Sequence, residues 1–99
     1  MNQFETVEMA SGGLALVLEP SAKWSDFAKH AITWSRKLKA KQLNNAVITA
    51  YECLQEVEIE GRQFWITYDD FQSSIQLEPA KNFSNGIILS IQKMLKSTN

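Results

Sequence analysis

Apolar and polar residues alternate through three consecutive runs between Val57 and Glu78, and turn-forming residues separate the runs. Alternation with a period of two places apolar side chains on one face of a β-strand and polar side chains on the other. The turns fall at Gly61 and at residues 69–73, where aspartate and serine can hydrogen-bond their own backbone. The pattern predicts an antiparallel meander whose strands lie at about 52–60, around inward-facing Phe64, Ile66 and Tyr68, and around inward-facing Ile75 and Leu77.

A hairpin is predicted ahead of this meander. Ser11-Gly12-Gly13 lies between two short alternating runs, one with Val7 and Met9 and the other with Leu14, Leu16 and Leu18. Glycine accepts the positive φ that tight hairpin turns require, so the pair Gly12-Gly13 favours a turn here. Pro20 then ends the second strand.

Two segments have the three-to-four-residue spacing of an amphipathic helix. The first follows Ser25, a good N-cap residue, and its apolar positions are Phe27, Ala28, Ala31, Trp34 and Leu38. The second follows Ser84, another candidate N-cap, and its apolar positions are Ile87, Ile88, Ile91, Met94 and Leu95. We expect residues 97–99 to form a frayed tail.

The predicted elements follow the order ββαβββα, and residues 46–51 are left open because Val47 and Ile48 could finish a helix or begin a strand. Each helix has one apolar stripe and each strand one apolar face. We therefore expect an α+β two-layer sandwich: a mostly antiparallel five-stranded sheet with two helices on one face. With 99 residues, 44% of them apolar, the chain suits a single domain over 1–99.

The net charge of −1 conceals a separation of charge along the chain. Residues 1–20 carry −3, residues 21–42 carry +5, residues 52–78 carry −6 and residues 79–99 carry +3. In a two-layer sandwich the positive blocks would lie on the helices and the main negative block near the sheet. We therefore expect a molecule with opposite charge on its two sides.

The sheet face away from the helices would meet solvent or a partner. By parity with Phe64 and Ile66, it would carry Glu58, Glu60, Trp65, Thr67, Gln76 and Glu78. An exposed tryptophan within an acidic rim is the best candidate for an interface, because one buried aromatic anchor inside a polar ring concentrates binding energy. The alternative is that charged strand faces only keep an open sheet from aggregating.

The run Arg36-Lys37-Leu38-Lys39-Ala40-Lys41 suggests a second interaction, with phosphates of a nucleic acid. Cations at the end of a helix are also explained by the helix dipole, and the overall acidic balance works against binding a polyanion. RNA or ribosome association through Arg36, Lys37, Lys39 and Lys41 is therefore the alternative function.

Catalysis has no positive support in the sequence. Cys53 and His30 are the only thiol and imidazole, and nothing in their spacing predicts that they meet. One cysteine permits neither an internal disulfide nor a thiolate metal cluster, and one histidine with scattered carboxylates is too few ligands for a metal site. No P-loop, dinucleotide fingerprint or G-x-S-x-G motif occurs. We expect no catalytic residue, no cofactor and no metal.

The chain is expected to be a soluble cytoplasmic protein. The start of the sequence has no basic n-region, and its longest apolar run, Leu14–Leu18, is far shorter than the roughly 18 residues needed to span a bilayer. A single cysteine fits a reducing compartment.

Several segments together resemble a family of small proteobacterial proteins catalogued as a domain of unknown function. The resemblance lies in Trp24-Ser25-Asp26-Phe27, Ile59-Glu60-Gly61, Trp65-Ile66-Thr67-Tyr68-Asp69 and Ser73-Ser74-Ile75-Gln76-Leu77-Glu78, within a likeness from about Leu14 to Leu95. It implies a shared fold and a bacterial cytosolic origin, singles out Glu52 and Glu78, and implies no activity. Gln76 departs from the family, which favours an aromatic there.

The sequence thus predicts a non-enzymatic module that binds another protein, or a second copy of itself, through the open sheet face around Trp65.

Overall fold

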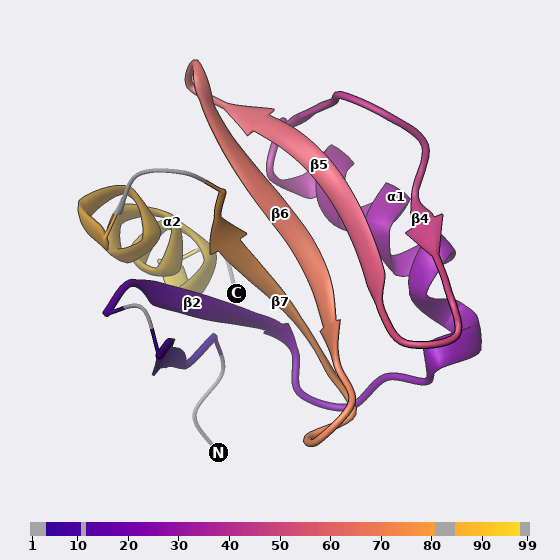
Figure 1. Ribbon diagram of the computed structural model, residues 1–99. Helices are drawn as coiled ribbons and strands as arrows, with labels where there is room; N and C mark the ends of the chain where they lie inside the picture. Colours follow the sequence, from indigo (N-terminus) through magenta and orange to yellow (C-terminus); the bar gives the residue numbers. More distant parts are fainter. Residues whose placement is uncertain (1–3, 11, 81–84, 98–99) are drawn as a thin grey trace.

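All the strands pair antiparallel with their neighbours in one sheet. The computed structural model describes residues 4–10, 12–80 and 85–97. The strand order is β1-β2-β7-β6-β5-β3, and β4 also pairs with β5 (Figure 1). The strands are β1 (Thr6–Glu8), β2 (Leu14–Glu19), β3 (Lys41–Gln42), β4 (Val47–Ile48), β5 (Cys53–Ile59), β6 (Arg62–Asp69) and β7 (Ser74–Pro79).

The predicted meander forms the centre of the sheet as β5, β6 and β7. The hairpin between β5 and β6 has two loop residues, Glu60 with φ 52° and Gly61 with φ 78°. A positive φ at both positions is the requirement of a type I′ turn, whose twist matches that of the flanking strands. The turn pairs Ile59 with Arg62 and so sets the register of the two long strands.

The hairpin between β6 and β7 is closed by Asp69. One oxygen of its carboxylate, Oδ1, accepts a hydrogen bond of 2.9 Å from the backbone N–H of Phe71, as the sequence predicted for this turn. Ser73 completes the loop with φ 51°, and Asp69 pairs with Ser74 across the hairpin. The predicted first hairpin is also present, with Gly12 at φ 95° and a hydrogen bond from the N–H of Gly12 to the carbonyl of Met9.

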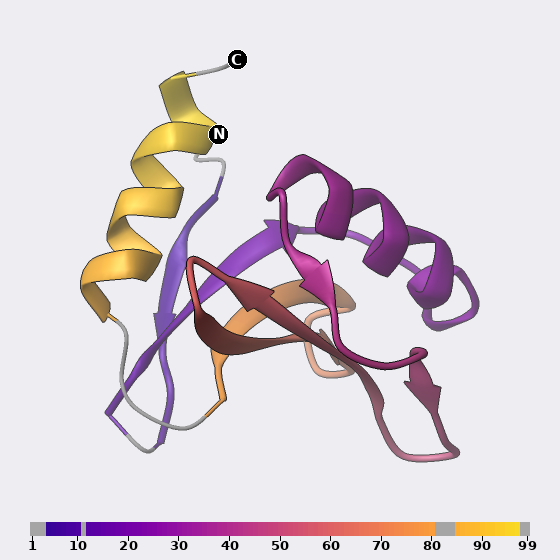
Figure 2. The ribbon, with the colours of Figure 1, turned by 90° about the horizontal axis from the view of Figure 1, so that it is seen from above.

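Two helices cover the same face of the sheet, and Figure 2 shows them on one side of it. Helix α1 (Phe27–Lys37) follows a 3-10 turn, η1 (Trp24–Asp26), and packs on β5, whereas α2 (Asn85–Ser97) packs on β2. Between these helices and the sheet lies the core, which contains Leu16, Leu18, Phe27, Ala31, Trp34, Leu38, Cys53, Val57, Ile59, Phe64, Ile66, Ile75, Leu77, Ile88, Ile91 and Leu95. The α+β two-layer class predicted from the sequence is confirmed.

Phe4 connects the two helices on the covered side of the sheet. Its ring meets the ring of Trp34 in α1 edge to face, with centroids 5.9 Å apart. Its carbonyl accepts a hydrogen bond of 2.8 Å from Nε2 of Gln92 in α2. The N-terminal segment therefore contacts both α1 and α2, which lie over different strands.

The prediction of five strands was wrong, because the chain between α1 and β5 adds β3, which lies outside the segment left open at residues 46–51, and β4, which lies within it. Each has two residues, and all four residues are exposed, so no burial pattern marks them in the sequence. Between them, Oδ1 of Asn44 accepts hydrogen bonds from Nε2 of Gln55 and from the N–H of Glu56. The Asn44 side chain thus connects the chain to β5 between the two short strands. Both strands pair with the same edge of β5.

Ser25 is not the N-cap of the first helix that the sequence predicted, because the N-cap position is Asp26. Trp24–Asp26 forms the 3-10 turn, Asp26 precedes the α-helix, and no side-chain hydrogen bond caps it. Trp24 instead packs edge to face on Tyr68, with ring centroids 5.3 Å apart, which ties the entry of the helix to β6. The predicted N-cap Ser84 lies outside the described residues. Ser97, predicted as frayed, closes α2 and donates a hydrogen bond to the carbonyl of Met94.

Neither α1 nor α2 has both the length and the apolar content needed to cross a bilayer, a result that applies to the residues the structure describes.

Phe4 is expected to contribute measurably to stability. We expect Phe4→Ala to lower the free energy of unfolding by about 1–3 kcal/mol, because it removes a half-buried ring and an aromatic pair. Phe71→Ala is the matched control, since the Phe71 side chain is fully exposed at the tip of the β6–β7 hairpin and should change stability by less than about 0.5 kcal/mol. Urea unfolding of both variants measures the difference, and equal losses would contradict this role of Phe4.

Candidate functional site

The sheet face away from the helices, called the outer face from here on, carries most of the predicted site. In the register of the sheet, Trp65 lies opposite Glu56 on β5 and Glu78 on β7. Thr67 lies opposite Leu54 on β5 and Gln76 on β7. Directly opposed residues of antiparallel strands share a face. The structure therefore brings Trp65, Thr67, Gln76 and Glu78 together, as the parity of the sequence indicated.

Hydrogen bonds hold two carboxylates in place on this face. The hydroxyl of Thr67 donates to Oε2 of Glu78 across the β6–β7 pair. Nε2 of Gln76 donates to Oδ2 of Asp69, at 3.2 Å, while the other oxygen of Asp69 caps the hairpin. The donors are neutral groups, so these bonds fix the positions of both carboxylates without a paired cation.

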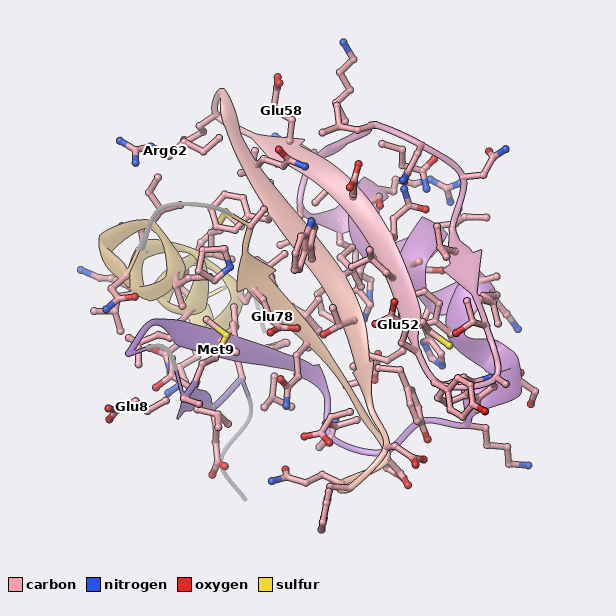
Figure 3. All side chains as sticks on the ribbon, viewed as in Figure 1. Glu8, Met9, Glu52, Glu58, Arg62 and Glu78 are labelled. Carbon is pink, nitrogen blue, oxygen red and sulfur yellow. The ribbon has the colours of Figure 1, made fainter. Side chains whose placement is uncertain are left out.

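A pocket of about 420 Å³ lies on the outer face. Figure 3 shows this face, with Glu78 over the middle of the sheet and Glu52 on the β5 side of it. The pocket combines an indole ring, apolar side chains, amide and hydroxyl groups, and carboxylates. Its lining residues are Glu52, Cys53, Leu54, Trp65, Thr67, Tyr68, Asp69, Gln76 and Glu78.

The Trp65 side chain is half-buried, unlike the core tryptophan Trp34. Its indole Nε1 is shielded from solvent and has no hydrogen-bond acceptor among the described residues. The Nε1 of Trp34, by contrast, donates to Glu19 at 3.1 Å. A buried donor without an acceptor costs stability, so the fold gains nothing from having an indole N–H at this position.

Two of the predicted site residues lie away from the pocket. Glu58 is on the outer face but near the far end of β5, opposite Lys41 of β3 and Gln63 of β6. Glu60 is not on a strand, because it occupies the left-handed position of the type I′ turn, where it lines a different hollow with Leu38 and Ile87. The prediction that Glu60 faces outward beside Trp65 was wrong, because strand β5 ends one residue earlier.

The basic residues of the alternative function are exposed but do not form one helix end. Arg36 and Lys37 end α1, Lys39 follows with φ 54°, and Lys41 belongs to β3. The ammonium of Lys37 lies 4.6 Å from the centroid of the Trp34 ring, a cation–π contact. Since Lys41 shares the outer face with Glu58, the helices do not hold all the positive charge. Nucleic-acid binding stays a prediction.

Cys53 and His30 line different pockets. Cys53 begins β5, is 2% exposed, and borders the outer-face pocket, whereas His30 lies on α1 in a hollow with Trp24 and Asp26. Burial raises the pKa of the Cys53 thiol above its ordinary value, which disfavours the nucleophilic thiolate. Among the described residues, no group of three or more His, Cys, Asp or Glu side chains is placed to hold a metal ion.

Sequence reasoning did not place Leu54, Tyr68 and Asp69 at this site. A turn was the favoured interpretation of Asp69, and the structure shows that its carboxylate both caps the turn and borders the pocket. Leu54 lies on the same face of β5 as Glu56 and Glu58, because these residues are two apart. Applying the same alternation one step earlier in the strand would have placed Leu54 at the site. Glu52, singled out by the resemblance, does line the pocket.

Comparisons of this chain with family models, with curated proteins and with solved structures found no match. The resemblance to the proteobacterial family remains a prediction.

The raised pKa of Cys53 makes stability depend on alkaline pH. The unfolded thiol loses its proton near its ordinary pKa, whereas the folded thiol, whose pKa is raised, still holds its proton at that pH. The stabilisation is complete below that pH and is lost as pH rises through the folded pKa. The free energy of unfolding of wild type minus that of Cys53→Ala should therefore shrink between about pH 7 and about pH 10. Urea unfolding of both proteins across this range measures it, and a constant difference would refute the assignment.

Proposed function

We propose that this protein is a non-enzymatic binding module and that it contacts a protein partner, or a second copy of itself, through the outer face around Trp65. The observation that carries the proposal is the position of Trp65: half-buried on the helix-free face, with Glu56 and Glu78 directly opposite on the two neighbouring strands. The contact surface comprises Trp65, Thr67, Glu78 and, at its margin, Glu58, while Gln76, which is buried, lines the pocket and holds Asp69.

This arrangement matches the general anatomy of protein interfaces. Binding energy concentrates in a few anchors, of which tryptophan is among the most frequent, surrounded by polar groups that exclude water. Here the surrounding groups already have fixed positions, through the hydrogen bonds of Thr67 to Glu78 and of Gln76 to Asp69. Side chains that are ordered before binding lose less conformational entropy on association.

The surroundings of Cys53 do not suit a cysteine nucleophile. A cysteine nucleophile needs a lowered pKa and an adjacent base. Burial moves the pKa of Cys53 in the opposite direction, and the imidazole of His30 lines another hollow. Binding requires neither group to react.

Trp65→Ala is expected to remove binding while leaving the fold intact. The ring lies on the outer face and not in the cluster of residues that forms the core, so its loss should lower the free energy of unfolding by no more than about 1–2 kcal/mol. Affinity capture from a lysate of the source organism, compared between wild type and variant, should show one or more proteins that only wild type retains. Light scattering over a dilution series reports separately on self-association.

Phe71→Ala is the control for this experiment, since it removes an aromatic ring that is fully exposed at a hairpin tip. It should retain the same proteins as wild type. Identical capture and identical solution mass for wild type and Trp65→Ala would refute the proposal.

A further inference from the structure

The charged side chains around the pocket on the outer face are carboxylates. Strands β2, β5, β6 and β7 present no lysine or arginine on the outer face within the described part of the chain. The carboxylates that line the pocket come from three separate places: Glu52 just before β5, Asp69 at the end of β6 and Glu78 on β7. Glu56 adds a fourth carboxylate directly opposite Trp65. Lys41, the one cation that the strand register of the described residues places on this face, lies opposite Glu58 and away from the pocket.

This charge distribution disfavours a symmetric dimer through the outer face. A twofold contact presents the same patch from both copies, so the carboxylates of one copy would meet those of the other. Like charges placed together across an interface oppose association. The chain does have an exposed basic segment, at Arg36, Lys37 and Lys39, but docking it into the pocket of another copy is a head-to-tail contact that forms rings or open chains.

We propose that the occupant of this pocket is an arginine-rich segment of another protein, held by charge complementarity with Glu52, Asp69 and Glu78 beside Trp65. This inference rests on the proposed function and specifies the chemistry of the partner. It explains why an indole is found here among carboxylates, because the ring supplies an electron-rich face and the carboxylates supply the opposite charge.

Arginine fits the site better than lysine. A guanidinium is planar, so it can stack on an indole while its forked N–H groups bond a carboxylate at two points. The pocket volume of about 420 Å³ is large enough for such a side chain. The carboxylates with fixed positions, Glu78 and Asp69, are suited to this directional geometry, whereas an ammonium acts as a point charge.

The probe is a fluorescent peptide of about nine residues in which arginine alternates with threonine, so that alternate side chains of an extended segment face the sheet. Two further peptides of the same length serve as comparisons. One has lysine in place of every arginine, and the other has citrulline, the neutral isostere of arginine. Fluorescence anisotropy at low salt gives the affinities. We expect saturable binding in the order arginine, lysine, citrulline, with the citrulline peptide weaker than the arginine peptide by at least about tenfold, or about 1.4 kcal/mol.

Variants locate the bound peptide. Glu52→Gln with Glu78→Gln should weaken binding of the arginine peptide by about tenfold or more, because it removes two of the lining carboxylates. The matched control is Glu5→Gln with Glu8→Gln, which changes the net charge equally at the β1 edge of the molecule; Figure 3 shows Glu8 well apart from Glu52 and Glu78. The control should bind within about twofold of wild type. Urea unfolding checks that each variant is folded.

The outcomes separate this inference from the proposed function. No saturable binding of the arginine peptide, or equal weakening by the control pair, would overturn the inference, the latter because it indicates only attraction to net charge. The proposed function would then stand without the inference if wild type captures a protein that Trp65→Ala does not retain. A solution mass that rises with concentration and falls after charge reversal at Arg36 and Lys39 would also overturn the inference, since a second copy would then be the occupant.

Discussion

The register of β6 between β5 and β7 determines both the core and the outer face. Phe64 and Ile66 point to the helices and are fully buried, while Trp65 and Thr67, which alternate with them along β6, point the other way. Because side chains alternate with a period of two, a shift of one residue would exchange these two sets. The two-residue turn at Glu60-Gly61 sets the pairing on one side, and the capped turn at Asp69 sets it on the other. The position of the pocket therefore depends on turns that lie at opposite ends of β6.

Much of this arrangement could be predicted because periodicity reports burial. The meander, strand β2 of the first hairpin and the two helices all contribute side chains to the core, and each gave a clear pattern in the sequence. Strands β3 and β4 gave none, since their residues are exposed on both faces and are too few to alternate. The start of α1 was misplaced because Trp24 packs on Tyr68, a contact between residues distant in sequence. Such contacts decide local structure without leaving a local signal.

The candidate site was predictable to the extent that it follows from strand parity. Trp65, Thr67, Gln76 and Glu78 obey the alternation and lie together, whereas Glu60 appeared to obey it and lies in a turn. The pocket also depends on where strands end, since Glu52 precedes β5 and Asp69 closes β6. Strand ends are set by turn geometry and by pairing with neighbours, and a pattern of apolar and polar residues locates them only to within a few positions.

The short strands at both edges of the sheet have a further consequence for how this protein meets other chains. A long, flat edge strand offers unpaired backbone groups to any extended segment and promotes polymerisation by strand addition. Here the long strands β5, β6 and β7 are all internal, while the edges are formed by β1, with three residues, and by β3 and β4, with two residues each. The sheet is thus protected against edge-to-edge aggregation. Recognition by this sheet then relies on side chains, which can discriminate between partners, more than on the backbone, which is the same in every protein.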